Sequence, residues 1–226
     1  FFASRLNMDR VAVPEPCQAL SSQDVLSAGF LEGLPLNQWI KTNPNQKARD
    51  QVAQTINDIF LKGFYELNCI HADPHPGNFI IDEDLCVGLV DFGCVKHFKP
   101  GFVELYGRLV GAIIRGDEDR YFHLVEQLDF LRPDLTESTR ADIFRTAFGF
   151  GQWIGEAFTA ERFDFGANKD FMIRGRKIAG RMSRHRKHLK MNPDFVFLDR
   201  TRYGLFRLFE MMGARVRMKN RYEWDK

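Results

Sequence analysis

One stretch of the sequence constrains the fold more than any other, because it combines a cluster of polar side chains with two apolar runs. It reads HADPHPGNFIIDEDLCVGLVDFG and extends from His71 to Gly93. The apolar runs are rich in β-prone residues and are separated by an acidic turn, which predicts a β-hairpin whose second strand ends at Asp91. Because polar residues occur at both ends of this hairpin, folding would bring Asp73, Asn78 and Asp91 together.

The spacing of these three residues indicates phosphoryl-transfer chemistry. Carboxylate and amide oxygens suit Mg²⁺, which usually completes its coordination with water and nucleotide phosphates. Asp73 and Asn78 are five positions apart, and Asp91 begins an Asp-Phe-Gly sequence. In the kinase template, the loop Asp orients the nucleophile, while the Asn and the later Asp hold the metal. The pattern predicts ATP and Mg²⁺ as cofactors, with His71 bracing the catalytic loop.

A transition-metal site is a different interpretation of the same stretch. Imidazole and carboxylate groups at alternate positions, as in His71, Asp73 and His75, can point the same way along a strand and bind a metal for hydrolysis. Pro74 disfavours a regular strand there. This alternative also leaves the Asp-Phe-Gly aspartate without a role.

The rest of the chain predicts a mostly helical α+β structure. A short strand is expected at Val25–Phe30, ending before Glu32-Gly33. An amphipathic helix is expected over residues 44–68, where apolar residues recur at intervals of three and four. After Pro100 the pattern is helical almost to the end. Breaks in it are expected at Gly116-Asp117, Pro133, Gly166 and Pro193.

Three separated blocks resemble the UbiB/AarF family of atypical protein-kinase-like proteins. The first is VAVPEPCQALSSQDVLSAGFLEGLPL, which is similar to the strand pair and hinge of that family. The second is HADPHPGN followed by VGLVDFG, and the third is NPDFVFLDRTRYGLFRLFEMMGARV near the C-terminus. Aminoglycoside-phosphotransferase-like kinases carry a similar loop, so the flanking blocks are what favour UbiB/AarF.

The resemblance implies a role for each matching position. Asp73 would be the catalytic-loop aspartate, and Asn78 and Asp91 would be Mg²⁺ ligands. The backbone of the hinge at Ala28, Gly29, Phe30 and Leu31 would face the adenine of ATP. The implied activity is an ATPase or unorthodox kinase that supports isoprenoid-quinone metabolism, particularly that of ubiquinone, at a membrane surface. Ala28 and Gly29 replace a bulkier residue and an acid of the family pattern, which leaves the nucleotide preference open.

The resemblance also implies a division of the chain into two parts. Residues 1–36 would be the end of an N-lobe and a hinge-like strand, and residues 37–226 a kinase-like helical C-lobe. The phosphate-covering loop, lysine and partner glutamate of the family lie upstream of the hinge, so the isolated chain is expected to be inactive. A non-catalytic pseudo-kinase module that binds nucleotide or a partner is the alternative from another functional class.

Composition bears on the surroundings in which the protein works. The chain is 44% hydrophobic and 27% charged, and it has no apolar run long enough to span a bilayer. It begins without Met or a leader pattern, so a piece of a longer protein is expected. Four scattered cysteines without CxxC spacing favour a reducing compartment. The expected location is therefore cytoplasmic, with peripheral contact to a membrane.

A basic run from Arg174 to Lys190 offers a candidate partner surface. It contains eight Lys or Arg and no acid, whereas the whole chain has a net charge of only +2. The run is interpreted either as a solvated face or as a surface for anionic membrane or an acidic partner. Nucleic acid is disfavoured because no aromatic residues interleave the charges. The aromatic residues at helical spacing between Phe144 and Phe158 are expected to form core. The oligomeric state stays open.

Overall fold

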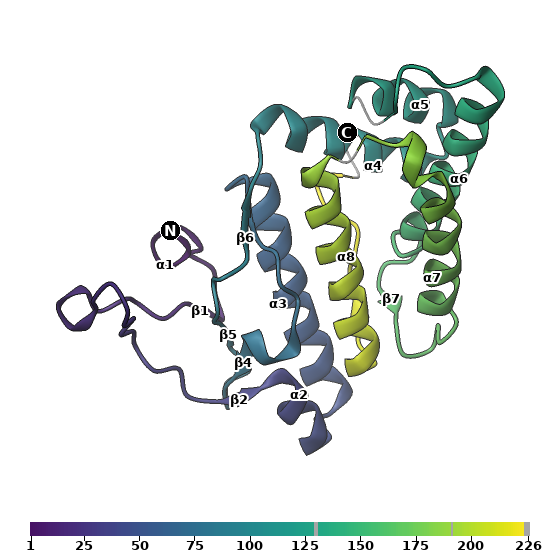
Figure 1. The fold of residues 1–226 in the computed structure, drawn as a ribbon. Coiled ribbons are helices and arrows are strands. Elements are labelled where there is room, and N and C mark those ends of the chain that lie inside the picture. The colour runs from purple at the N-terminus through teal and green to yellow at the C-terminus, as the bar shows by residue number, and fades with distance from the viewer. Residues whose placement is uncertain (129–130, 191, 224–226) are drawn as a thin grey trace.

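The computed structural model describes residues 1–128, 131–190 and 192–223 (Figure 1). Its helices are α1 (Phe2–Arg5), α2 (Leu36–Trp39), α3 (Gln46–Tyr65), α4 (Pro100–Arg115), α5 (Glu118–Gln127), α6 (Glu137–Glu156), α7 (Phe171–Met182) and α8 (Pro193–Met212). Its strands are β1 (Val11–Ala12), β2 (Leu34–Pro35), β3 (Cys69–His71), β4 (Phe79–Ile81), β5 (Val87–Leu89), β6 (Val95–His97), β7 (Phe163–Asp164) and β8 (Arg215–Val216). The 3-10 turns are Gln18–Leu20, Ile40–Thr42, Pro76–Asn78 and Ser183–His188. The α+β, mostly helical class predicted from the sequence is confirmed.

The predicted hairpin is present as β4 and β5, which pair in antiparallel fashion with Phe79 opposite Leu89. Its second strand ends at Leu89, two residues before the predicted end, because Asp91 has a left-handed backbone with φ of 59°. β1 and β2 flank the hairpin in a sheet of order β1-β5-β4-β2. Strands from residues 1–36 thus share a sheet with residues 79–89, and the division at residue 36 stays a prediction.

The strand predicted at Val25–Phe30 is wrong. Only Ala28 forms a β-bridge there, to Pro16, within an arm that extends away from the helices (Figure 1). Phe30 is 89% exposed and Leu26 is 79% exposed. A β-prone run needs a neighbouring strand and a face to bury, and within the described chain this arm pairs only with itself.

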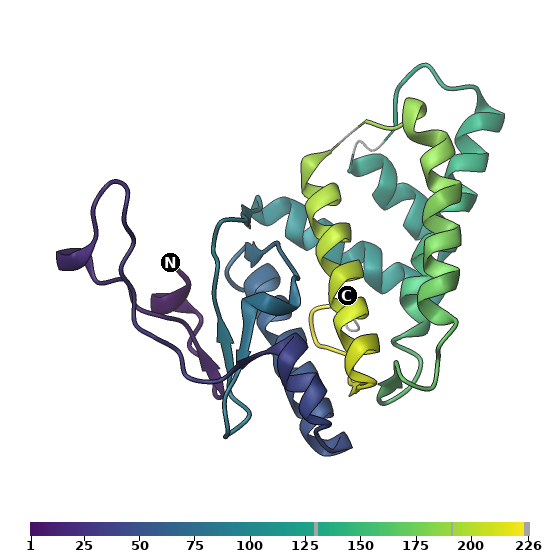
Figure 2. The same ribbon diagram turned by 60° about the horizontal axis from the view of Figure 1, so that its bottom comes forward.

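α3 and α8 form the centre of the helical region. The apolar stripe predicted for α3 is confirmed, since Val52, Ile56 and Phe64 are buried. α8 lies beside α3, and the α6–α7 pair lies on its other side (Figures 1 and 2). The helix breaks also match: α4 ends at Arg115 and is capped by Gly116, whose φ is 68°, and Pro193 begins α8.

The aromatic residues after α5 mostly pack into the core, as predicted. Phe144, Phe148, Trp153 and Phe158 are buried, and the Trp153 indole donates to the Phe171 carbonyl at 2.9 Å. Within the described residues, no helix has the length and apolar character that would let it cross a bilayer.

Candidate functional site

The candidate site lies where the loop after β3 meets the segment after β5. β3 pairs with β6, so that His71 lies opposite Val95. Ala72 donates to the Cys94 carbonyl at 2.8 Å, and Val90 donates to the Asn78 carbonyl at 3.0 Å. These backbone bonds hold the loop and the Asp-Phe-Gly segment side by side, so the sequence-predicted residues Asp73, Asn78 and Asp91 lie on adjoining segments.

Asp73 and Asn78 contact each other directly. The Asn78 amide nitrogen donates to Asp73 Oδ2 at 3.0 Å and to the Asp73 carbonyl at 3.2 Å. Asn78 is buried, and within the described residues no hydrogen bond reaches its amide oxygen. The amide is therefore oriented by Asp73 and keeps one oxygen available for a hard cation.

Asp91 sits at a sharp change in backbone direction. A left-handed backbone is uncommon outside glycine, although Asp tolerates it because its side chain can bond locally. Here Oδ1 of Asp91 accepts from the Gly93 amide at 3.1 Å. Within the described residues no hydrogen bond reaches Oδ2, and Asp91 is exposed. One carboxylate oxygen is thus fixed, and the other is open to a ligand.

His71 contacts the backbone at the start of the Asp-Phe-Gly segment. Its Nε2 lies 2.7 Å from the Asp91 carbonyl and 3.1 Å from the Val90 carbonyl, so this nitrogen must carry the hydrogen. His71 is buried, which places it behind the site and away from a reacting group. The arrangement argues against the transition-metal alternative, because Nε2 is occupied by carbonyl oxygens. The described residues also hold no group of three His, Cys, Asp or Glu that could bind a metal.

Arg200 is a site residue that the sequence reasoning missed. It reaches from α8 and donates to Asp73 Oδ1 at 3.1 Å. α8 also packs on the loop at Gly204, where a Cβ would come within 2.1 Å of Pro74 Cγ. Both oxygens of Asp73 are therefore held, one by Asn78 and one by Arg200. An arginine 127 positions away gives no local signal, so only its place in the third resemblance block could have directed attention to it.

The predicted hinge residues are not gathered at this site. Ala28, Gly29 and Phe30 lie on the exposed arm, where the Gly29 amide donates to the Glu15 carbonyl at 3.0 Å. Only Leu31 reaches the hairpin, since a Cβ on Gly88 would come within 2.7 Å of its Cδ1. The adenine-facing role of these four residues stays a prediction.

The basic run forms α7 and the following 3-10 turn. Arg174 pairs with Glu156 and Asp170, which neutralises one end of the run. Further along, several cations are exposed and make no ion pair with a described residue. They are Arg176, Lys177, Arg181, Arg184, Arg186 and Lys187.

Comparison with known proteins identifies the relatives of this chain. A family model described as the ABC1 atypical kinase-like domain matches residues 2–125, which is more than half of the chain. The atypical kinase COQ8B, mitochondrial, of Danio rerio is 28% identical over 98% of this chain and 35% of its own length. The atypical kinase coq-8, mitochondrial, of Caenorhabditis elegans is 24% identical over 91% of this chain and 27% of its own length. The chain thus spans about a third or less of these relatives.

A solved structure shares the fold. It is the complex of Rv3197 with erythromycin from Mycobacterium tuberculosis, which matches with a TM-score of 0.70 and 20% identity. The match covers 96% of this chain and 52% of that chain. At this level of identity the match shows the fold alone, and it confirms the kinase-like C-lobe architecture predicted from the sequence.

Proposed function

Because the chain belongs to the ABC1 atypical kinase-like family, the UbiB/AarF group that its sequence resembles, we propose that it forms the Mg²⁺-binding part of an ATP-dependent phosphotransferase or ATPase. The observation that carries the proposal is the placing of three oxygen-bearing side chains on joined segments. Asn78 donates to Asp73, and the segment that carries Asp91 is held to this loop by the hydrogen bond from the Val90 amide to the Asn78 carbonyl. The free oxygens of Asn78 and Asp91 are the ligand type that Mg²⁺ prefers. When bound, the cation would neutralise charge on the phosphates of ATP.

In this proposal each residue has a limited task. Asp73 orients the group that receives the phosphoryl group, while Asn78 holds that carboxylate through Oδ2. Arg200 fixes the other oxygen and lowers the charge that an incoming phosphate would meet. His71 fixes the backbone carbonyl of Asp91 and so the direction of its side chain. Phosphoryl transfer depends mainly on such positioning and charge neutralisation.

The metabolic role is proposed from the family to which the chain belongs. Resemblance to the UbiB/AarF family supports a role in isoprenoid-quinone metabolism, with ubiquinone as the first candidate, and relatives named as mitochondrial kinases agree with it. The alternative is a pseudo-kinase module that binds nucleotide without turnover. Hydrolysis by the full-length protein separates the two, because the pseudo-kinase would bind Mg·ATP and leave it intact.

We expect Asp91→Asn to weaken Mg·ATP binding at least about tenfold, because the variant replaces a charged metal ligand by a neutral one. The measurement is calorimetric titration of the full-length protein with ATP at several Mg²⁺ concentrations, followed by an ATP hydrolysis assay. Asp84→Asn is the matched control, since Asp84 is an exposed acid on the hairpin turn. Equal Mg²⁺ dependence and equal hydrolysis in the Asp91 variant and the parent would refute the metal assignment.

We also propose that the exposed cations of α7 and the following turn contact an anionic membrane surface. Each such cation contributes roughly 1 kcal/mol near anionic lipid, so Lys177→Glu with Arg181→Glu should weaken binding at least about tenfold. The measurement is co-sedimentation with vesicles that contain phosphatidylserine. Lys41→Glu with Lys47→Glu, two exposed sites elsewhere, is the control. Equal binding to phosphatidylcholine vesicles would show that charge plays no part.

A further inference from the structure

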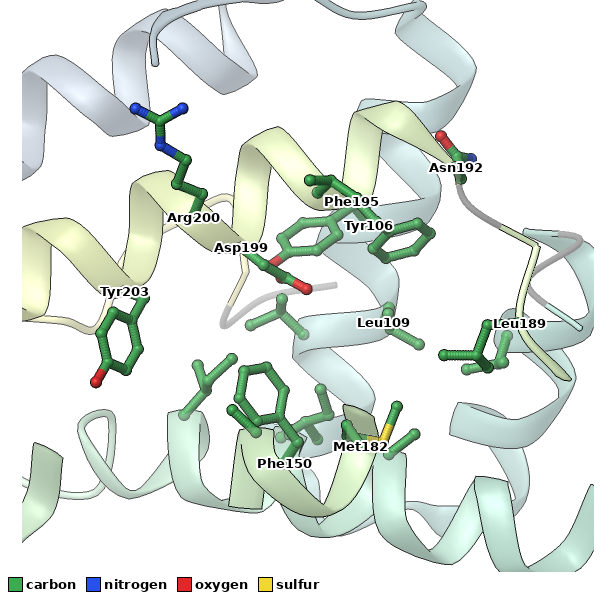
Figure 3. A pocket seen from close by; sticks show the side chains of 18 of the residues that line it. Tyr106, Leu109, Phe150, Met182, Leu189, Asn192, Phe195, Asp199, Arg200 and Tyr203 are labelled. Atoms are coloured by element: carbon green, nitrogen blue, oxygen red, sulfur yellow. The ribbon is translucent and has the colours of Figure 1, made fainter. Parts of the chain in front are cut away.

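A cavity lies away from the catalytic loop, among the helices of the C-terminal half. Its volume is about 480 Å³, within the range of roughly 300–1,000 Å³ that is usual for small-molecule sites. Side chains from α4, α5, α6, α7 and α8 surround it. The lining is mostly apolar and includes Leu109, Phe150, Met182 and Leu189 (Figure 3). A cavity of this size and character suits a compact hydrophobic molecule.

One acidic side chain interrupts this apolar lining. Asp199, on α8, directs its carboxylate into the cavity (Figure 3). It is the only acidic residue in the described lining, and no hydrogen bond or ion pair with the described chain reaches its oxygens. Burial raises the pKa of Asp199 from 3.8 to about 7, although the nearby Arg202 acts in the opposite direction. Asp199 is thus partly buried, and its carboxylate lacks a close partner within the described chain.

The other polar groups around the cavity do not supply that partner. Tyr106 of α4 and Tyr121 of α5 are buried, and burial raises the pKa of both phenols, so they stay neutral.

The cations near Asp199 have other partners or positions. Arg202 of α8 pairs with Glu223. Arg200 is directed away from the other labelled side chains and pairs with Asp73 (Figure 3). Two further cations that line the cavity, Arg186 and Lys190, come from the segment before α8.

We propose that this cavity is a binding site for a lipophilic amine, whose ammonium group contacts the Asp199 carboxylate while its hydrocarbon part fills the apolar lining. Charge complementarity favours the amine, because a cationic ammonium compensates a desolvated carboxylate more strongly than a neutral group does. Asp199 would repel an anionic ligand at its own position, although Arg186 and Lys190 line another part of the cavity. A neutral ligand would gain only the apolar contacts. The inference does not rest on the proposed phosphotransferase function.

The test compares three probes that share one hydrocarbon cage: 1-aminoadamantane, 1-adamantanol and adamantane-1-carboxylate. Calorimetric titration of the protein at pH 8 should give at least about tenfold tighter binding of the amine than of the alcohol, as expected for a charge-assisted contact. The amine should bind about tenfold more tightly at pH 8 than at pH 6, because Asp199 ionises near pH 7 while a primary amine, like Lys, stays protonated at both.

Two substitutions locate the binding. Asp199→Asn keeps the shape of the side chain and should remove both the preference for the amine and its pH dependence. Asp194→Asn, on the same helix but outside the cavity lining, is the matched control and should retain both. Ala147→Met, which fills part of the cavity from α6, should weaken all binding.

Several results would overturn the proposal. Equal affinity for the amine and the alcohol would reduce the site to a hydrophobic space without charge recognition. Tightest binding of the carboxylate would mean that the lining cations Arg186 and Lys190, and not Asp199, govern recognition. If no probe bound, the cavity would not be a site for such ligands. If the preference for the amine survived in Asp199→Asn, the amine would be recognised by another residue.

Discussion

Glu223→Gln is expected to lower the free energy of unfolding by roughly 3–5 kcal/mol, because it leaves a buried guanidinium without its counter-ion. Glu223 is fully buried and pairs with Arg202, which is 3% exposed. The Glu223 carboxylate also accepts from the Tyr65 hydroxyl at 2.6 Å and from the Asn220 amide at 2.8 Å. This network ties the C-terminal segment to α3 and α8. Chemical denaturation at pH 7 measures the effect.

Two further variants show whether the unpaired charge is the cause. Glu66→Gln is the matched control, since Glu66 pairs with Arg221 at an exposed position and should cost less than about 1 kcal/mol. Adding Arg202→Met to Glu223→Gln should restore part of the lost stability, because the stranded charge is then gone. If the double variant were less stable than Glu223→Gln, the loss would come from packing and not from charge.

The local parts of the site could be predicted from the sequence because they depend on residues that are close together in the chain. The β4–β5 hairpin follows from two β-prone runs and an acidic turn, and its ends carry Asn78 and Asp91. The hydrogen bond between Asn78 and Asp73 spans only five positions. Such contacts are decided by turn chemistry and strand alternation, which short sequence patterns record.

Contacts between residues far apart in the sequence could not be predicted from local patterns. Arg200 meets Asp73 only because α8 packs on the catalytic loop at Gly204, a contact that no periodicity specifies. Asp199, the next residue toward the N-terminus, faces the opposite environment and enters the cavity. Two adjacent charged residues on one helix thus have different environments. Which environment each residue has depends on how the surrounding helices pack, and the sequence pattern does not contain that information.

The wrong strand at Val25–Phe30 has a related cause. The run has good intrinsic β-propensity, but propensity in strands reflects packing against neighbours more than a backbone preference. Among the described residues this run forms only the bridge at Ala28 and a few hydrogen bonds within the arm, and its apolar side chains stay exposed. A strand therefore could not be predicted reliably without knowing which residues would pair with it.

Asp199→Asn is expected to make the protein more stable at pH 8, with a gain that shrinks toward pH 5. The folded state raises the pKa of this carboxyl from 3.8 to about 7 by desolvation. Both states bind the proton below pH 4, so the group costs nothing there. As the pH rises through 4 to 7, the unfolded chain ionises more readily than the folded one, and stability falls. Above pH 7 the ionised Asp199 lowers the free energy of unfolding of the parent by about 4 kcal/mol. We expect Asp199→Asn to recover about 2 kcal/mol of this, because the Asn side chain also loses hydration on folding.

Thermal and chemical unfolding of the parent and the variant at pH 5, 6, 7 and 8 measure this difference. Asp194→Asn, which removes an acid from the same helix and loses its ion pair with Lys96, should show no such gain. A parent and Asp199 variant whose stabilities differ by the same amount at every pH would show that Asp199 is not desolvated. This carboxylate weakens the fold at neutral pH, lies in a mostly apolar cavity and makes no hydrogen bond or ion pair within the described chain. Such destabilisation is the behaviour expected of a ligand-binding group, since functional groups commonly reduce stability where a partner restores it.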